Sequence, residues 1–314
     1  MDVSHVLDSL NANQREAVGA PCSNLLILAG AGSGKTRVLV HRIAWYISTG
    51  EASPHGILAV TFTNKAAAEM RSRIENLLGQ STRGMWVGTF HSLCHRLLRS
   101  HCQDANLSEN FQILDNEDQY RTIRRTIRTM MLDESQYSPK EVQWYINAQK
   151  DKGLRPDDIK DDDVTIAQMV QVYKNYQETC ERSAAVDFAE LLLRTYELFK
   201  KNDVIREYYQ QRFKHILVDE FQDTNELQYK WLSLLIGNNN TLFAVGDDDQ
   251  SIYSWRGARV ENMQAFERDF ENTKLLKLEQ NYRSTTTILK AANKLIGNNS
   301  ARLGKNLWTD GEEG

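Results

Sequence analysis

One glycine-rich segment constrains this chain more than any other part of it. The segment, Ala29-Gly30-Ala31-Gly32-Ser33-Gly34-Lys35-Thr36, follows the apolar run 25–28 and precedes residues 37–48, which have helical periodicity. A strand, a glycine-rich turn and a helix start in this order are what a phosphate-binding loop requires. Glycines let backbone N–H groups surround a polyphosphate, and the helix N-terminus adds partial positive charge. A ligand-free glycine turn is the alternative, but the Gly-Lys-Thr ending favours a phosphate site.

Two side chains of this segment have chemistry of their own. Lys35 is placed to neutralise β- and γ-phosphate oxygens, and the Thr36 hydroxyl is placed to ligate Mg²⁺. Ala29 stands where the first glycine of such loops usually lies, and its small side chain still fits. The sequence therefore predicts a site for a nucleoside triphosphate with Mg²⁺.

Composition excludes several classes of protein. Of the 314 residues, 41% are hydrophobic and 25% are charged, which is ordinary for a globular protein. The net charge of −4 means that any nucleic-acid site must be a local patch. No apolar run approaches the roughly 18 residues of a membrane span, and we see no signal peptide. Four cysteines without framework spacing indicate reduced thiols in a cytosolic protein.

Short apolar runs alternate with helical patterns along most of the chain. This alternation is typical of an α/β fold, a parallel sheet covered by helices on both faces. Between about 90 and 214 the strand-like runs become few, which predicts a mostly helical insertion between two sheet strands. A further helix is expected over 285–296. The runs expected to form strands are 25–29, 57–62, 85–88, 216–218, 241–245 and 275–278.

Two carboxylates, Asp219 and Glu220, end the buried run 215–218. In open α/β sheets, ligands bind at the carboxyl ends of the strands. Asp219 is then placed to hold Mg²⁺ beside Thr36, and Glu220 to orient and deprotonate an attacking water. A solvated acidic strand end is the alternative, but the phosphate loop favours hydrolysis.

Two later strand ends carry further candidates. Gln250 follows the run 241–245 and is placed to contact the γ-phosphate or the attacking water. Tyr282 and Arg283 follow the run 275–278, where Tyr282 could stack on adenine and Arg283 could reach the γ-phosphate. The alternatives are a polar loop for Gln250 and a surface ion pair for Arg283.

Aromatic residues and amides, in place of carboxylates, follow the other strand-like runs. The most suggestive stretch, 250–257, holds Tyr253, Trp255 and Arg256 only a few residues after Gln250. Aromatic platforms bind single strands at roughly 1–3 kcal/mol per stacked base. This spacing indicates that a γ-phosphate sensor and a base-stacking residue share one loop. The alternative is that the two rings pack beneath the loop.

Two other patterns have simpler interpretations. Four arginines at helical spacing, Arg121, Arg124, Arg125 and Arg128, could contact a duplex backbone, but a solvated helix face is the simpler interpretation. The histidines and cysteines between 91 and 102 match no standard zinc spacing, and interleaved leucines indicate a core helix.

Taken together, the motifs resemble those of the UvrD-like superfamily 1 DNA helicases, over essentially the whole chain. The matching segments are 10–18, 29–36, 62–67, 88–91, 186–188, 218–223, 246–257 and 280–284. The resemblance implies ATP and Mg²⁺ as cofactors, with catalytic roles for Lys35, Asp219, Glu220, Gln250 and Arg283. It implies nucleotide contacts from Gln14, Ala29, Gly30, Ala31, Gly32, Ser33, Gly34, Lys35, Thr36, Arg37, Tyr282 and Arg283, and metal contacts from Thr36 and Asp219. It also implies DNA contacts from Phe62, Asn64, His91, Phe188, Tyr253, Trp255 and Arg256.

The resemblance also implies a domain plan and a biological role. A RecA-like core would comprise 1–89 and 215–280, a helical insertion 90–214, and the start of a second RecA-like domain 281–314. The family implies ATP-driven 3′→5′ translocation on single-stranded DNA and separation of strands at single-strand/duplex junctions. Proteins of mismatch and nucleotide-excision repair are the implied partners, in a bacterial cytoplasm, at the nucleoid and away from membranes.

Translocation requires two domains that close on ATP. The motifs of the family's second domain are not among these 314 residues, so we expect an N-terminal portion of a longer helicase. Such a portion would bind nucleotide and single strands weakly, turn over ATP very slowly and not unwind DNA alone. A kinase or transport ATPase, and a non-catalytic nucleotide-binding module that docks repair partners, are the competing hypotheses.

Overall fold

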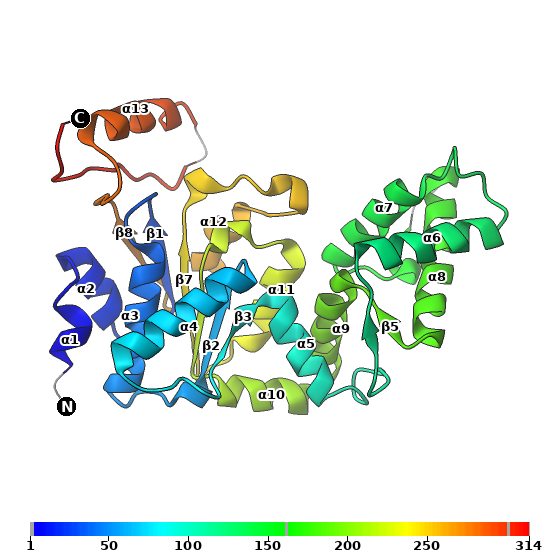
Figure 1. Ribbon diagram of the computed structural model, residues 1–314, viewed down its shortest axis with the longest axis horizontal. Helices are drawn as coiled ribbons and strands as arrows, with labels where there is room; N and C mark the ends of the chain where they lie inside the picture. Colours follow the sequence, from blue (N-terminus) through cyan, green and yellow to red (C-terminus); the bar gives the residue numbers. More distant parts are fainter. Residues whose placement is uncertain (1–2, 161–162, 300–301, 314) are drawn as a thin grey trace. The chain divides into compact units, whose positions relative to one another are not determined.

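The computed structural model describes residues 3–160, 163–299 and 302–313, and its packing divides the chain into two units (Figure 1). Unit 1 comprises Met1–Phe90, Arg206–Thr224 and Leu235–Gly314, and unit 2 comprises His91–Ile205 and Asn225–Leu234. Residues 206–214 were expected in the insertion but belong to unit 1, because Tyr209 and Phe213 pack on Trp86. Residues 225–234, expected in the core, belong to unit 2, where Trp231 stacks on Phe199.

Unit 1 contains the predicted parallel sheet, which confirms the α/β fold. Its six strands run in the order β3-β2-β6-β7-β1-β8, and each neighbouring pair is parallel. All six predicted runs form strands, although β8 at the sheet edge is only partly buried. The strands are β1 (Leu25–Ala29), β2 (Ile57–Thr61), β3 (Trp86–Thr89), β6 (His215–Val218), β7 (Thr241–Gly246) and β8 (Lys274–Leu278).

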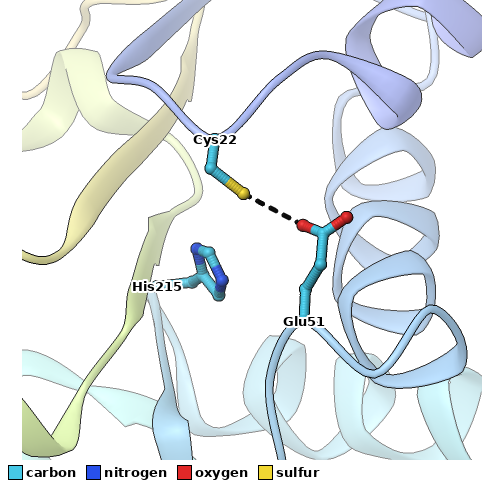
Figure 2. Close-up of side chains that lie close together, drawn as sticks. All are labelled: Cys22, Glu51 and His215. Atoms are coloured by element: carbon cyan, nitrogen blue, oxygen red, sulfur yellow. Dashed lines mark hydrogen bonds between the residues drawn. The ribbon is translucent and has the colours of Figure 1, made fainter.

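Parallel strands have all their amino ends on one side of the sheet and all their carboxyl ends on the other. These two sides are called here the amino edge and the carboxyl edge. At the amino edge, Cys22, Glu51 and His215 lie close together (Figure 2). At the carboxyl edge lie the loops that follow β1, β6, β7 and β8, which carry the residues expected to bind nucleotide. The sheet therefore separates two clusters of reactive side chains.

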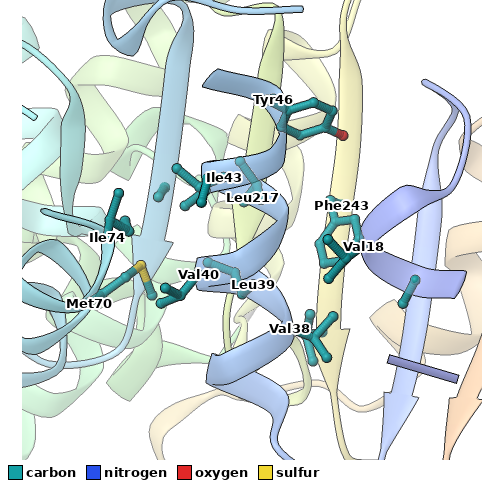
Figure 3. Packing of buried hydrophobic residues seen from close by; sticks show 14 of the residues in the cluster. Val18, Val38, Leu39, Val40, Ile43, Tyr46, Met70, Ile74, Leu217 and Phe243 are labelled. Carbon is teal, nitrogen blue, oxygen red and sulfur yellow. The ribbon is translucent and has the colours of Figure 1, made fainter. Parts of the chain in front are cut away.

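The core of unit 1 holds α3 and α4 against the sheet (Figure 3). Val38, Leu39 and Ile43 of α3 and Met70 and Ile74 of α4 are fully buried, in one cluster with the sheet residues Leu217 and Phe243. Gly79 follows the last residue of α4 in the left-handed conformation that glycine favours at helix ends. The helices wholly within unit 1 are α1 (Ser4–Leu7), α2 (Ala12–Gly19), α3 (Lys35–Ser48), α4 (Asn64–Leu78), α12 (Glu261–Asp269) and α13 (Thr286–Ile296).

Unit 2 is mostly helical, as the sparse strand pattern predicted. A core of its own includes Ile123, Ile127, Val142, Ile146 and Tyr176, all buried. A two-stranded parallel ladder that the sequence did not indicate pairs β4 (Gln112–Ile113) with β5 (Ala185–Val186). Its helices are α5 (Phe90–Ser100), α6 (Asn116–Thr129), α7 (Pro139–Asp151), α8 (Val164–Arg182), α9 (Phe188–Lys201) and α11 (Glu226–Leu235), while α10 (Asp203–Arg212) runs from one unit into the other.

A buried ionic cluster fixes α7 to α9 inside unit 2. The ammonium of Lys150 lies 2.7 Å from Asp187 and 2.9 Å from Glu190, and all three side chains are at most 5% exposed. Arg155 adds two bonds to Glu190, and the Tyr176 hydroxyl donates to Asp187 at 2.7 Å. Every charge in the cluster has a partner of opposite sign, which is the condition for burying it.

The arginines of α6 lie on its solvated face. Arg121 pairs with Glu117, and Arg124 and Arg128 both pair with Glu134, with all three guanidinium groups well exposed. Exposed pairs of this kind contribute little stability.

All four cysteines are free thiols, and within the described residues no helix is long and apolar enough to cross a bilayer.

We expect Asp151→Asn to stabilise the protein at pH 7. Burial raises the pKa of Asp151 from its usual 3.8 to about 6, and Asn225 donates to its carboxylate at 3.1 Å, a bond that an asparagine oxygen can keep. Because the folded pKa is above the unfolded one, the cost of the charge is absent below pH 3.8 and complete above about pH 6. Urea denaturation should show a gain of about 1–3 kcal/mol at pH 7 and none at pH 3.5. An equal gain at both pH values would contradict this assignment.

Candidate nucleotide and DNA site

The loop after β1 wraps closely against its surroundings. Gly32 and Gly34 have positive φ values of 68° and 90°, a conformation that glycine adopts without strain. A Cβ at Gly32 would lie 2.6 Å from the amide nitrogen of Asn281, and one at Gly34 would lie 2.9 Å from that of Gln14. The Ser33 hydroxyl donates back to the Gly30 carbonyl at 2.7 Å, which closes the turn. Gly32 and Gly34 are therefore required for two reasons: their backbone conformation and the lack of space for a Cβ atom beside Asn281 and Gln14.

Helix α3 begins at Lys35, directly after the loop, and its first two residues face the acidic strand ends. The Lys35 ammonium lies 3.7 Å from Glu220 and 3.9 Å from Asp247, with a side chain that is 10% exposed. The Thr36 hydroxyl donates to Asp219 Oδ2 at 3.1 Å. The structure thus brings the neighbours Lys35 and Thr36 together with the neighbours Asp219 and Glu220. More than 180 positions of the sequence separate the two pairs.

The two carboxylates after β6 have different environments. Burial, together with the neighbouring Glu220 charge, raises the pKa of Asp219 to about 6. Its backbone N–H donates to the Val60 carbonyl at 2.9 Å, which fixes it to β2. Glu220 has a φ of 52°, an uncommon left-handed conformation for glutamate, and its side chain is 33% exposed. Glu220 is therefore the carboxylate that solvent can reach, as a residue that activates water must be.

A glutamine that we did not single out from the sequence joins two strand ends. Gln222 donates from its amide nitrogen to Glu220 at 2.8 Å and accepts from the Asp247 N–H at 3.0 Å. Asp247 in turn accepts a hydrogen bond from the side chain of Gln250. A continuous polar chain therefore leads from Glu220 through Gln222 and Asp247 to Gln250.

The residues expected around the base lie beside the loop. Gln14 is 1% exposed and donates to the Ser33 carbonyl at 2.9 Å, while Asn11 and Gln14 form a capping box at the start of α2. Asn11 also donates to the Tyr282 hydroxyl at 2.6 Å and to Gln280 at 2.9 Å. Tyr282 is 55% exposed, so a ligand can reach this residue.

The chain after β8 returns to the phosphate loop. The amide nitrogen of Asn281 donates to the Ala31 carbonyl at 2.5 Å, and the Tyr282 N–H donates to the Gly32 carbonyl at 3.0 Å. Asn281 Oδ1 accepts from the Arg283 N–H at 2.7 Å. The backbone of Arg283 is therefore held beside the loop, and the residue is exposed. Arg37 donates from its guanidinium to the Ser9 carbonyl at 2.7 Å.

Lys305 neutralises the acidic turn after β7. Its ammonium lies 2.7 Å from Asp247, 2.5 Å from Asp248 and 2.8 Å from Asp249, with 4% of the residue exposed. Arg302 makes two further bonds of 2.7 Å to Asp249. Residues 302–313 thus pack on unit 1, and their expected place in a second domain remains a prediction.

Four of the residues expected to contact DNA gather in unit 1. Phe62 and Tyr253 stack with centroids 5.1 Å apart, and Trp255 lies 6.3 Å from Tyr253. The Arg256 guanidinium lies 4.6 Å from the Trp255 ring centroid. Trp255 is 68% exposed, so it does not pack beneath its loop, whereas Tyr253 is half-buried between its neighbours. The group forms an open aromatic platform.

The other three residues expected to contact DNA lie elsewhere. His91 and Phe188 both belong to unit 2, where their rings meet edge to face at 6.1 Å, and Phe188 is 46% exposed. Burial lowers the pKa of His91, so its ring is neutral at neutral pH. Asn64 is exposed at the first position of α4.

The fold and these contacts define a P-loop nucleotide-binding protein, and comparisons with known proteins make that class more specific. The profile of the UvrD/REP helicase N-terminal domain matches residues 10–271. The chain is 62% identical to DNA helicase II of Escherichia coli over 315 residues, and 58% identical to that of Haemophilus influenzae over 319, which covers all of the chain and 44% of each relative. It is 43% identical to the ATP-dependent DNA helicase PcrA of Bacillus subtilis over 313 residues, 99% of the chain and 42% of that relative.

The chain therefore belongs to the UvrD/REP helicase N-terminal domain family. It spans less than half the length of the curated relatives named above.

Proposed function

We propose that this chain supplies the ATP-hydrolysing and single-strand-binding part of a 3′→5′ DNA helicase of the UvrD type. The observation that carries the proposal is the contact of Lys35 with Asp247, which Gln250 also contacts through its side chain. Gln250 lies three positions before Tyr253 and five before Trp255. The phosphate loop and the aromatic platform are therefore joined by a short run of covalent and polar links within unit 1.

Each residue of the nucleotide site has a role that its position supports. Lys35 would neutralise β- and γ-phosphate oxygens, the N–H groups of the loop would bind the phosphates, and Tyr282 would stack on the adenine beside Gln14. Glu220 would accept the proton of the attacking water, because it is exposed and 3.7 Å from Lys35. Gln250 and Arg283 would contact the γ-phosphate.

A hydroxyl and a carboxylate in contact, Thr36 and Asp219, fit the hard oxygen donors that Mg²⁺ prefers. When bound there, Mg²⁺ would neutralise charge on the β- and γ-phosphates. The burial of Asp219 also fits this role, because a buried carboxylate gains most from a cation partner.

In unit 1, Phe62, Tyr253, Trp255 and Arg256 would form a DNA-binding surface, with Asn64 nearby in sequence. In unit 2, His91 and Phe188 would make DNA contacts of their own. Bases stack on aromatic faces without sequence preference, and an arginine adjacent to the rings can contact phosphate.

The whole protein would act in mismatch and nucleotide-excision repair, at single-strand/duplex junctions, with repair proteins as partners. It would work in the cytoplasm at the nucleoid of a bacterium. The names of its relatives, DNA helicase II and ATP-dependent DNA helicase PcrA, support the helicase part of the proposal.

Glu220→Gln tests the hydrolytic part of the proposal. Glutamine keeps the shape of Glu220 and a hydrogen bond with Gln222 but cannot accept a proton. We expect ATP affinity within about threefold of the parent and single-turnover hydrolysis slower by about 10²–10⁴-fold. Binding is measured with a fluorescent ATP analogue and hydrolysis by phosphate release. Unchanged hydrolysis would remove Glu220 from the mechanism.

Trp255→Ala tests the DNA surface. The exposed indole is expected to stack on a base, so its loss should weaken binding of oligo(dT) by about 1–3 kcal/mol, or roughly 5–150-fold. Nucleotide affinity should stay unchanged. Trp144→Ala is the matched control, because Trp144 is also exposed, at 70%, but lies on α7 of unit 2. Equal losses of nucleotide and DNA affinity in Trp255→Ala would indicate that the ring supports the loop and does not stack on DNA.

A further inference from the structure

Three potential metal ligands meet at the amino edge of the unit 1 sheet, away from the phosphate loop. Cys22 precedes β1, Glu51 follows α3, and His215 opens β6 (Figure 2). One ligand atom from each residue lies within 4.8 Å of the other two. The loop residues 30–34 follow the opposite end of β1, about 15 Å along the five-residue strand. The cluster is therefore separate from the proposed nucleotide site.

The surrounding contacts hold each ligand in place. Arg42 donates from its guanidinium to the carbonyls of Val18 and Ala20 at 2.5 and 2.6 Å and to that of Pro21 at 3.3 Å, which fixes the loop that carries Cys22. Gly50, with a φ of 76°, turns the chain out of α3 at the residue before Glu51.

His215 is the buried member of the cluster. Its ring stacks on Tyr46 with centroids 3.6 Å apart, and its Nδ1 contacts the Thr241 hydroxyl at 2.9 Å. The hydroxyl can accept a hydrogen bond from a protonated Nδ1, and that tautomer leaves Nε2 with a lone pair to bind a metal.

The chemistry of the three ligands matches a divalent transition metal. In the structure the Cys22 thiol donates to Glu51 Oε2 at 3.0 Å. A tetrahedral Zn²⁺ between the two atoms would need a sulfur-to-oxygen distance of about 3.6 Å, given its usual bond lengths. Loss of the thiol proton would leave a thiolate and a carboxylate, whose two negative charges balance a divalent cation. Arg42 opposes cation binding by its charge, while its two terminal nitrogens donate to backbone carbonyls.

We propose that Cys22, Glu51 and His215 form a binding site for Zn²⁺ or a chemically similar divalent metal, which links the segments before β1, after α3 and at the start of β6. Solvent supplies the fourth ligand, because Cys22 and Glu51 are both exposed. The role is structural, since three segments that are far apart in sequence would be fixed to one ion. The other cluster of this kind among the described residues, Asp247–Asp249, already has Lys305 as its cation.

Cobalt is the probe, because Co²⁺ bound by a thiolate gives a charge-transfer absorption that oxygen ligands do not give. The full chain, reduced and stripped of metal with a chelator, is titrated with Co²⁺ in the absence of nucleotide, and Zn²⁺ is then added. We expect one equivalent of Co²⁺ with a thiolate band, which Zn²⁺ displaces. Cys22→Ser should abolish the band, and Glu51→Gln should weaken Co²⁺ binding by at least about tenfold, as loss of a ligand does.

Two variants control for other sites. Cys102→Ser removes a partly exposed thiol in unit 2 that belongs to neither cluster, and Asp219→Asn alters the proposed Mg²⁺ site. Both should keep the band at full strength. Absence of a thiolate band in the parent chain overturns the proposal, and so does a band that survives Cys22→Ser. Cys22→Ser and Glu51→Gln both change exposed side chains, so we expect the fold to persist. Circular dichroism checks this.

Discussion

Substituting Lys35 with alanine should remove nearly all ATP hydrolysis and weaken ATP binding. Its ammonium is the positive charge between Glu220 and Asp247, at 3.7 and 3.9 Å. Without it, a triphosphate would meet the Glu220 carboxylate with no ammonium beside it, and the β- and γ-phosphates would lose a direct charge partner. Loss of one preorganised charge of this kind lowers the rate by about 10²–10³-fold. ATP affinity should fall as well, because the lysine contacts the phosphates before the reaction.

The measurement is a titration with a fluorescent ATP analogue together with single-turnover phosphate release. Lys140→Ala is the control, since it removes the same charge from an exposed position on α7 of unit 2. We expect that variant to behave like the parent. Wild-type affinity and rate in Lys35→Ala would contradict the assignment of the loop after β1 as the phosphate site.

Lys150→Met should cause the largest loss of stability among single substitutions in unit 2. Methionine has a similar length, but it leaves Asp187 and Glu190 buried without the ammonium that lies 2.7 and 2.9 Å from them. Removing one partner of a buried pair costs about 3–5 kcal/mol, because the other charge remains in the low-dielectric interior. Burial alone would raise the pKa of Glu190, but Lys150, Arg155 and Arg194 together hold it well below its usual range.

Urea denaturation at neutral pH measures this loss. Lys174→Met is the matched control, because Lys174 also pairs with an aspartate, Asp157 at 3.1 Å, but at the surface. That variant should lose less than about 1 kcal/mol. Similar small losses in both variants would contradict the buried ionic cluster as the support of α7 and α9.

Local sequence patterns predicted the sheet and the backbone of the site. The apolar run 25–29 ends in glycines and a lysine, so strand, loop and helix follow from a short segment. The carboxylates after 218 could be assigned to the carboxyl edge because parallel strands share one direction. The sequence left open whether Trp255 packs beneath its loop, and the structure shows that it is exposed.

Contacts between distant segments could not be predicted in this way. Gln222 joins two strand ends and Lys305 neutralises the turn 247–249, yet each is an ordinary polar residue in its local sequence. The two-residue strands β4 and β5 are too short to give an alternating pattern. Cys22 and His215 lie in segments whose proximity depends on the strand order of the sheet.

We expect nucleotide and single-stranded DNA to bind to sites of unit 1 that communicate. Coupling is reciprocal, so each ligand must change the affinity for the other by the same factor. The most direct test is to titrate the chain with a fluorescent, non-hydrolysable ATP analogue and Mg²⁺, with and without saturating oligo(dT). We predict that DNA changes the nucleotide affinity by about fivefold or more, the usual lower range of such coupling, and that Gln250→Ala reduces this factor. Identical nucleotide affinity with and without bound DNA would contradict the account.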